Sequence, residues 1–383
     1  MEKNNSLGII GAGSCGNQQA LLAGKENMPV LAINSASIDL DDIMNDPEAQ
    51  DYCTVIKIGD TEGCGKNRKL AKKLLKQDVK EVLEATEIVF GKEEIKTVIV
   101  TGSTNSGTGS GLIALLADIL RSVYPDMTII TMPILPCDKT PRSLANSIEC
   151  MKEIIELNIP YIPIDNSKCK GKSIKEIYDR VNQDILYNFK IINGDFIRPS
   201  SYGNMDEQDR KRLFSTPGMM RISKVSGLKN NLEESIGSLI VDSIKQNFGA
   251  DLKGDKVIKR MGVIYTVTEE MLQKIDNTYE EVIDYIGTPI EIFEHINIVE
   301  DEKECSIITI LAGLSAPDDR LEEMSQIVMR AQNDVSKFNE SKVSEYNKSL
   351  AWLNDLDDDD DDLGIKVEEK PKADIDNIVN KYF

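Results

Sequence analysis

The first half of this chain alternates short apolar runs with longer stretches of helical periodicity. Apolar runs of this kind, separated by helices, are typical of buried strands in a parallel sheet. The runs that predict such strands are Leu7–Ile10, Val30–Ile33, Thr97–Val100, Met127–Ile130 and Tyr161–Ile164. Helices are predicted between them, among others over Leu112–Val123 and Ser143–Glu156. Since ligands of such sheets bind in loops beyond the carboxyl ends of the strands, we expect the functional site there.

The pattern changes after Asp165. Apolar side chains recur at helical spacing over Ile174–Ile192, which predicts one long helix. Strand and helix patterns then mix, with strands predicted over Val257–Val267, Ile290–Ile298 and Ser306–Leu314, and a polar helix from Asp318 to about Leu353. The chain is therefore predicted to have an α/β fold built from a parallel-sheet domain (1–173), a central helix (174–200), a smaller α+β domain (201–316), a long C-terminal helix (317–354) and an acidic tail (355–383).

The acidic tail differs in kind from the rest of the chain. Asp357–Asp362 is an unbroken run of aspartates, and such a block repels itself, so a disordered spacer is predicted. Past it, apolar residues share one stripe of a short predicted helix: Ile375, Ile378, Val379, Tyr382 and Phe383. This stripe is expected to fold onto a surface, although a frayed terminus with chance spacing is the alternative.

Charge and composition exclude several classes of function. A balance of 45 Lys and Arg against 65 Asp and Glu gives a net charge of −20, which argues against direct binding of nucleic acid. Without a run of about 18 apolar residues or a signal-peptide layout, we expect no membrane span and no export. The 7 cysteines lack paired metal spacing and fit a reduced, cytoplasmic compartment. The single histidine, His295, rules out histidine clusters and the usual triads, and we expect it to be structural.

A first glycine-rich segment follows the first predicted strand and opens a helix. Gly11–Gly16 (GAGSCG) has the spacing G-x-G-x-x-G, whose glycines let backbone N–H groups approach a phosphate. NAD-binding domains share this spacing, so an NAD-dependent oxidoreductase is an alternative. The second strand, however, ends in Asn34–Ala36 (NSA) rather than in the acid that holds a ribose. A P-loop is excluded, because the Gly-Lys pairs at Lys66 and Lys172 lack its other glycine.

A second glycine-rich segment, Gly102–Gly111 (GSTNSGTGSG), follows another predicted strand and precedes an apolar helix. Its glycines alternate with hydroxyl residues, which gives a run of backbone and side-chain donors for one anion. A flexible linker is the other interpretation, and it fits poorly because buried elements flank the segment closely. Two such loops in one parallel sheet predict a polyphosphate held from both sides, with Mg²⁺ on the phosphates.

These segments resemble the tubulin/FtsZ superfamily of GTPases. Asn105–Gly111 (NSGTGSG) is similar to the signature G-G-G-T-G-[ST]-G, with Asn105 and Ser106 in place of the first two glycines. Gly11–Asn17 resembles the first nucleotide loop of the family, and Gly63–Asn67 the loop that faces the γ-phosphate. The missing glycines and the different tail separate this chain from tubulin itself and from the cell-division FtsZ proteins.

Further segments extend the resemblance. Pro133–Arg142 resembles the loop whose arginine reaches the nucleotide, and Ile162–Asn166 the segment that contacts the ribose. Tyr178 and Asn182, one helical turn apart, match the aromatic that stacks on guanine and the asparagine that bonds its edge. The resemblance thus implies GTP/GDP binding by Gly11, Ala12, Gly13, Ser14, Cys15, Gly16, Asn17, Asn34, Gly63, Gly65, Lys66, Asn67, Asn105, Ser106, Gly107, Thr108, Gly109, Ser110, Arg142, Asp165, Asn166, Tyr178 and Asn182.

The last motif is Asn204–Asp209 (NMDEQD), which resembles the family's catalytic loop Asn-x-Asp-x-x-Asp/Glu. In the family this loop completes the active site of the next subunit in a filament, which implies catalytic roles for Asn204, Asp206 and Asp209. Two carboxylates three positions apart at a helix start share one face and can position water. An ordinary acidic first turn that complements the helix dipole is the alternative.

The resemblance is to the TubZ-like plasmid and phage tubulins in particular. It implies a GTPase that polymerises head to tail and segregates DNA through a DNA-bound adaptor, captured by the acidic tail. A tubulin-like filament with another cargo or a division role is an alternative within the family. The cargo, the adaptor, the number of protofilaments and the plasmid, phage or chromosomal origin do not follow from the sequence, and GTP rather than ATP follows only from the resemblance.

Overall fold

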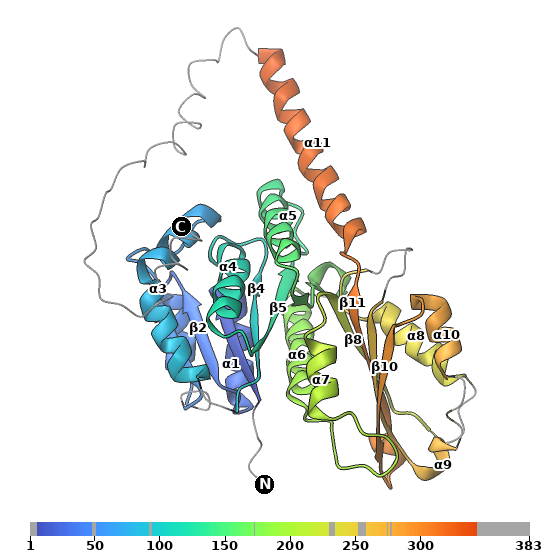
Figure 1. Ribbon diagram of the computed structural model, residues 1–383. Coiled ribbons are helices and arrows are strands. Elements are labelled where there is room, and N and C mark those ends of the chain that lie inside the picture. Colours follow the sequence, from blue (N-terminus) through green and yellow to red (C-terminus); the bar gives the residue numbers. More distant parts are fainter. Residues whose placement is uncertain are drawn as a thin grey trace.

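The computed structural model describes residues 6–47, 51–91, 94–171, 173–229, 234–251, 258–273, 275 and 278–342. In this part of the chain, one mixed sheet runs through the molecule, and helices cover both of its faces (Figure 1). The strand order is β10-β9-β11-β8-β6-β5-β4-β1-β2-β3, and β7 pairs with β5. This arrangement confirms the predicted α/β architecture with a parallel-dominated sheet.

The first half is a parallel sheet with β/α connections. Its strands are β1 (Leu7–Ala12), β2 (Val30–Asn34), β3 (Cys53–Lys57), β4 (Thr97–Ser103) and β5 (Thr128–Leu135). Its helices are α1 (Gly13–Lys25), α2 (Ile38–Met44), α3 (Arg68–Phe90), α4 (Thr108–Val123) and α5 (Pro141–Glu156). All pairings among these strands are parallel, so their carboxyl ends meet at one edge of the sheet. We call this edge the carboxyl edge.

The predicted strand over Tyr161–Ile164 is wrong as a single element. The structure has two short strands instead, β6 (Pro160–Tyr161) and β7 (Ile164–Asp165), followed by the 3₁₀ turn η1 (Asn166–Lys168). Pro163 lies in the break, and proline has no N–H with which to continue a ladder. Its carbonyl oxygen instead accepts a hydrogen bond from the Ala250 N–H, at 3.0 Å.

The predicted central helix is confirmed as α6 (Ile174–Asn193). The Ser173 hydroxyl accepts from the Glu176 N–H at its start, and Gly194 ends it at φ 89°, so the helix ends before residue 200. At its far end, the Asn193 side chain accepts from the Ser6 N–H (3.1 Å), just before β1 begins. Since its 20 residues span about 30 Å, α6 crosses the sheet from the carboxyl edge to the amino end of β1.

The second half extends the same sheet. It comprises α7 (Glu207–Phe214), β8 (Gly218–Ser226), α8 (Ile236–Gln246), β9 (Arg260–Val267), α9 (Glu269–Leu272), α10 (Thr278–Ile286), β10 (Glu291–Ile298), η2 (Glu302–Glu304) and β11 (Ser306–Leu314). Strand β8 joins the halves by pairing with β6. The apolar core beneath α6 accordingly combines residues from both halves, such as Ile134, Phe189 and Met220. The two halves share their core rather than each burying one of its own.

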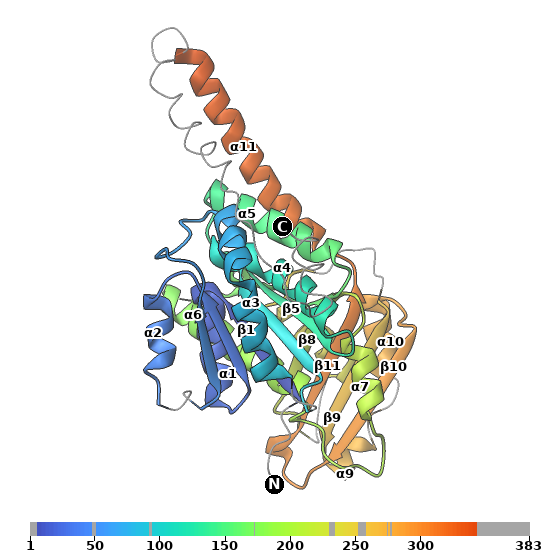
Figure 2. The ribbon, with the colours of Figure 1, turned by 60° about the vertical axis from the view of Figure 1, so that its left-hand side comes forward.

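Helix α11 (Asp318–Lys342) packs against α5 and then projects from the body (Figures 1 and 2). Arg320 anchors its first turn: its Nε lies 3.0 Å from Asp165 Oδ2, and its guanidinium donates to the Pro136 carbonyl (2.8 Å). The predicted helix extended to about Leu353, but residues 343–383 lie outside the described residues, as do the spacer and the apolar stripe of the tail. None of the helices described is long and apolar enough to cross a membrane.

Candidate nucleotide site

The two glycine-rich loops touch each other at the carboxyl edge. Gly13 has φ +71°, and a Cβ there would lie 2.9 Å from the backbone nitrogen of Gly109. A Cβ on Gly109 would in turn lie 2.8 Å from the Ser103 carbonyl oxygen and 3.0 Å from that of Ala12. Both loops therefore depend on glycine for their close approach, which aligns the starts of α1 and α4 side by side.

The helices that begin at these loops lack the usual caps. In α1, α4 and α5, the N-cap residue makes no side-chain cap hydrogen bond, and the first turn holds no acidic residue. Side-chain caps are present at α3, α6, α7, α8 and α9, from Asn67, Ser173, Asp206, Ser235 and Thr268. Helix α2 also lacks a side-chain cap, but its first turn holds Asp39 and Asp41. Free N–H groups and the positive end of the helix dipole favour an anion. The starts of α1, α4 and α5 are therefore suited to an anion such as a phosphate.

A third loop, Gly63–Asn67, closes over the second. A Cβ on Gly107 would lie 2.8 Å from the Cys64 Cβ, and the Ser35 hydroxyl bridges Cys64 (3.3 Å to Sγ) and Thr108 (2.9 Å to Oγ1). Gly63 and Gly65 have φ of +109° and +52°, with open space among the described atoms where a Cβ would point. These two glycines thus provide backbone conformation rather than room.

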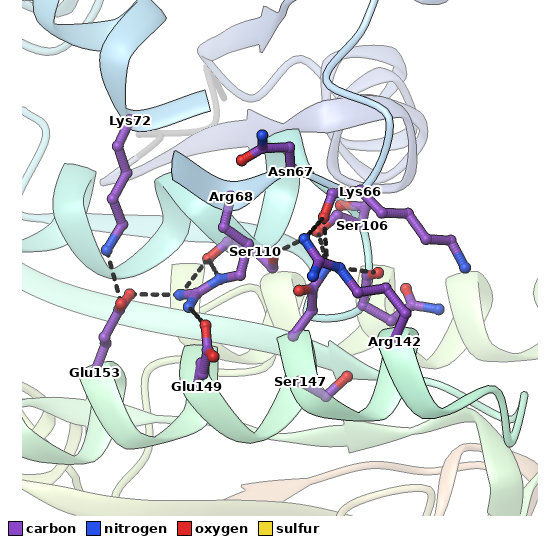
Figure 3. Close-up of polar contacts among 12 residues, drawn as sticks. Lys66, Asn67, Arg68, Lys72, Ser106, Ser110, Arg142, Ser147, Glu149 and Glu153 are labelled. Carbon is purple, nitrogen blue, oxygen red and sulfur yellow. Dashed lines mark hydrogen bonds and ion pairs between the residues drawn. The ribbon is translucent and has the colours of Figure 1, made fainter. Parts of the chain in front are cut away.

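The start of α5 fixes the third loop against the second (Figure 3). Asn146 donates from Nδ2 to the carbonyl oxygens of Lys66 (3.0 Å) and Ser106 (3.2 Å). The Lys66 ammonium donates to Ser143 Oγ (2.6 Å), and Arg142 reaches the Lys66 carbonyl (3.5 Å). Lys66 and Arg142 are both exposed, so two cationic side chains lie beside these loops, where they could pair with an anion.

A network of ion pairs and hydrogen bonds around the buried Arg68 links α3, α4 and α5 beneath these loops (Figure 3). Arg68 is buried and donates to the Ser110 carbonyl oxygen (3.1 Å) in the first turn of α4. Its guanidinium also pairs with Glu149 (2.7 Å) and Glu153 (2.6 Å) of α5, and Lys72 pairs with Glu153 (2.7 Å). The helices that begin at these loops are thus connected to one another by ion pairs and hydrogen bonds.

Asp138, in the loop after β5, orients Asn105. Its carboxylate accepts from Asn105 Nδ2 (2.8 Å) and from the backbone N–H of Thr140 (3.0 Å). Burial opposes ionisation of Asp138, but the hydrogen bonds from Thr140 and Asn105 outweigh it and lower its pKa. Asn105 stands where the family signature has glycine, so this bond explains how a larger residue is accommodated there.

Tyr178 lies beside the first glycine loop at the start of α6. Its side chain is 43% exposed, an unusual position for a ring on a core helix. Partial burial raises the pKa of its hydroxyl, with further contributions from Cys137, Cys15 and Asp138. Those neighbours belong to the first loop and to the loop after β5, so the Tyr178 hydroxyl lies near both of these loops. Asn182, one turn further, is partly buried.

Other predicted residues have structural partners. The Asn34 amide donates to Asp39 (2.9 Å), and Asn17, with its amide oriented to donate, bonds the Gly11 carbonyl (3.0 Å). The Asp165 carboxylate is nearly fully buried against Arg320. By contrast, the Oδ1 atom of Asn166 is buried with no hydrogen-bond partner in the described structure, and is free to accept from a ligand.

The acidic loop lies at the other end of α6. Asp206 caps α7 in a capping box: its carboxylate accepts from the Asp209 N–H (2.8 Å), and that of Asp209 accepts from the Asp206 N–H (3.3 Å). Arg210, in the first turn of α7, donates to the Ile192 carbonyl (2.9 Å) at the end of α6. Since α6 spans about 30 Å, these carboxylates cannot reach the glycine loops of the same chain.

The described residues include no cluster of three or more His, Cys, Asp or Glu side chains that could hold a metal. The donor set, which consists of backbone amides, hydroxyls and two cations, instead fits a polyphosphate, and a polyphosphate can carry Mg²⁺ on its own oxygens.

The geometry fits a nucleotide-binding site that uses glycine-rich loops and no P-loop lysine. Residues 6–173 match the model of the Tubulin/FtsZ family, GTPase domain. This part of the chain is thus a GTPase domain of the tubulin/FtsZ family, which replaces the NAD alternative.

Similar proteins cover most of the chain. The tubulin-like protein CetZ of Thermococcus kodakarensis is 23% identical over 359 residues, covering 92% of this chain and 93% of the relative. The tubulin-like protein TubZ of Clostridium botulinum C phage is 23% identical over 390 residues, covering 97% and 93%. The solved GTPγS-form protofilament of Bacillus thuringiensis serovar israelensis TubZ has a TM-score of 0.71 at 17% identity, covering 88% of this chain and 95% of that one. The relatives include both CetZ and TubZ proteins, so they do not single out TubZ.

Sequence reasoning missed Ser35, Asp138 and Asn146 as parts of the site. Asn146 follows Arg142 by four positions in a helix, and therefore lies on the same face. That spacing was the available signal. Ser35 and Asp138 acquire their roles only from contacts between loops distant in sequence.

Proposed function

We propose that this protein is a GTP-dependent, head-to-tail polymerising GTPase whose active site is completed by a second subunit. The observation that carries the proposal is the separation of its two half-sites by α6. The phosphate-binding loops lie at the carboxyl edge, and the acidic loop lies about 30 Å away beside the end of α6. Stacking subunits along α6 brings the acidic loop of one onto the nucleotide of the next, which is a heterologous, open assembly.

In this proposal the amides of Gly11–Asn17 and Asn105–Ser110 bind the phosphates, and Lys66 and Arg142 supply positive charge. Tyr178 stacks on guanine, while Asn166 and Asn182 donate to or accept from the nucleoside. Mg²⁺ binds the phosphate oxygens and neutralises their charge during transfer. The similar TubZ structure carries GTPγS in a protofilament, which supports both the ligand and the mode of assembly.

The acidic residues act on the water that attacks the γ-phosphate. Asn204 and Asp206 are exposed, and Asp209 is partly exposed, so their polar atoms are available to a neighbouring subunit. The capping box of Asp206 and Asp209 orients both carboxylates at the start of α7. Positioning and charge are the main contributions a protein makes to this reaction.

Turnover per subunit is expected to depend on protein concentration. Below the assembly threshold the monomer binds GTP but lacks the acidic loop of a neighbour, so hydrolysis is slow. Above it, turnover per subunit rises together with light scattering. Turnover that is the same per subunit below and above the threshold would show that the site is complete in one chain.

The finer part of the proposal concerns cargo and compartment. We propose that filaments act in the cytoplasm, where the free state of all 7 cysteines is stable, and segregate DNA through a DNA-bound adaptor. The acidic tail suits a basic adaptor, and the similarity to a phage TubZ supports this cargo. The CetZ relatives favour a second candidate, a filament with another cargo.

Removing residues 364–383 tests the role of the tail. GTP binding is expected to stay intact, because the glycine loops, Lys66 and Arg142 are all retained, while assembly or adaptor capture changes. A truncated protein with unchanged assembly and unchanged adaptor capture would rule this role out.

A further inference from the structure

His295, on β10, is fully buried and makes two hydrogen bonds that bear on the acidic loop. Its Nδ1 accepts from the backbone N–H of Met205, at 3.3 Å, and its Nε2 lies 3.0 Å from Oδ1 of Asn297. Met205 lies between Asn204 and Asp206, in the loop that we propose acts on the nucleotide of a neighbouring subunit. A residue predicted to be merely structural therefore contacts the proposed catalytic loop directly.

Strand β10 holds the whole segment from the end of α6 to α7. It is the outermost strand of the described sheet, and this segment makes hydrogen bonds to it at His295, Ile296 and Asn297. Asn297 Nδ2 donates to the Phe196 carbonyl (2.9 Å), and its Oδ1 accepts from the Arg198 N–H (3.1 Å). The Ile296 N–H donates to the Gly203 carbonyl (3.2 Å). His295 makes the last of these contacts, with the N–H of Met205, which directly precedes Asp206.

The tautomer of His295 is set by these neighbours. A backbone N–H can only donate, so Nδ1 must carry a lone pair toward Met205. The ring then carries its proton on Nε2 and donates to Asn297 Oδ1. Asn297 is itself fixed, because its amide nitrogen also donates to the hydroxyl of Thr266 (3.1 Å). The acceptor that faces Met205 is thus held in place by a chain of buried hydrogen bonds.

The side chains around Met205 alternate. Met205 is buried, whereas Asn204 and Asp206 on either side are exposed. Fixing the Met205 backbone consequently fixes the direction in which its two neighbours leave the surface. We infer that His295 is a positioning residue, which holds the Met205 amide so that Asn204 and Asp206 meet the nucleotide of the next subunit. This inference rests on the proposed function.

The test compares three replacements in the full-length protein. His295→Asn places an amide oxygen near the position of Nδ1 and can still accept from Met205. His295→Gln places its amide near Nε2, where it reaches Asn297 but not Met205, and His295→Phe fills the volume without an acceptor. A merely structural role ranks the variants by volume and by thermal stability, whereas a positioning role ranks them by the acceptor at Nδ1.

We expect His295→Asn to keep its turnover in filaments within about twofold of the wild type. The turnover of His295→Gln and of His295→Phe should fall by about tenfold or more. GTP affinity of the dilute monomer should be unchanged in all three, since the glycine loops lie beyond α6. Hydrogen exchange of the Met205 amide should be slow in the wild type and in the Asn variant and faster in the Gln variant.

Two results would overturn the inference. The first is a turnover of His295→Gln equal to that of the wild type. The second is a loss of turnover in His295→Asn as large as the loss in His295→Phe. The pair Asp206→Asn and Asp209→Asn, measured in parallel, separates this failure from that of the proposed function. If the acidic variants lose turnover while His295→Gln does not, only the positioning role is wrong. If the acidic variants keep full turnover, the proposed function itself fails.

Discussion

Replacing Gly109 by valine is expected to remove GTP binding. A Cβ at this position already meets the carbonyl oxygens of Ser103 (2.8 Å) and Ala12 (3.0 Å), both of which are backbone atoms that cannot move independently. A branched side chain must push the two glycine loops apart, and the start of α4 with them. Because we propose that the amides of both loops bind the same phosphates, we expect affinity to fall by about 100-fold or more, measured by titration of the dilute monomer with labelled GTP.

Gly203→Ala is the matched control for this measurement. Gly203 lies beyond α6, and a Cβ there would meet its nearest neighbour at 3.5 Å, an ordinary contact. Its GTP affinity should equal that of the wild type. If Gly109→Val binds GTP as tightly as Gly203→Ala does, the phosphates are not held between these loops.

Replacing Asp209 by asparagine is expected to stop turnover without affecting GTP binding. Asparagine has nearly the same shape and can still accept from the Asp206 N–H, so the capping box and α7 are retained. Only the negative charge is lost. We expect filaments that assemble with GTP and persist, with turnover per subunit reduced by about 100-fold, followed by phosphate release and light scattering.

The choice of asparagine separates catalysis from capping. An acidic first turn stabilises a helix on its own, and the structure shows that Asp206 and Asp209 do perform this role. If they do nothing else, Asp209→Asn should hydrolyse GTP at the normal rate. Glu207→Gln is the control, because Glu207 is exposed in the same turn and takes no part in the capping box.

Strands could be predicted from the sequence where they consist of apolar residues throughout. The predicted strands of the first half are confirmed at β1, β2, β4 and β5, because parallel strands covered on both faces consist of apolar residues. Strand β3 was missed since it is an edge strand with half-buried residues. Strand β8 was missed because Arg221 interrupts its pattern, yet Arg221 is buried and donates to the Ile244 (3.0 Å) and Gly249 (2.7 Å) carbonyls. A buried arginine of this kind cannot be recognised without its tertiary partners.

The site was predictable to the extent that backbone geometry requires particular residues. Gly13, Gly107 and Gly109 could be predicted because only glycine permits the close approach that the structure shows. The roles of individual side chains were harder to predict from the sequence. Asp165 pairs with Arg320, a residue 155 positions away in the sequence (320 minus 165), and the role of His295 depends on a loop 90 positions before it. Contacts between residues so far apart in the sequence cannot be predicted from the spacing of residues.

The central claim, that two subunits share one active site, is tested most directly by mixing two inactive variants. Gly109→Val lacks a nucleotide site but keeps its acidic loop, and Asp209→Asn lacks the charge but binds GTP. In filaments in which sedimentation shows both variants in equal amounts, roughly one interface in four joins an intact nucleotide site to an intact acidic loop, so we expect roughly a quarter of the wild-type turnover. Asp209→Asn mixed with the double variant Gly109→Val, Asp209→Asn should remain inactive. If the first mixture is as inactive as this control, the acidic loop does not act on a neighbouring subunit's nucleotide, and the account is contradicted.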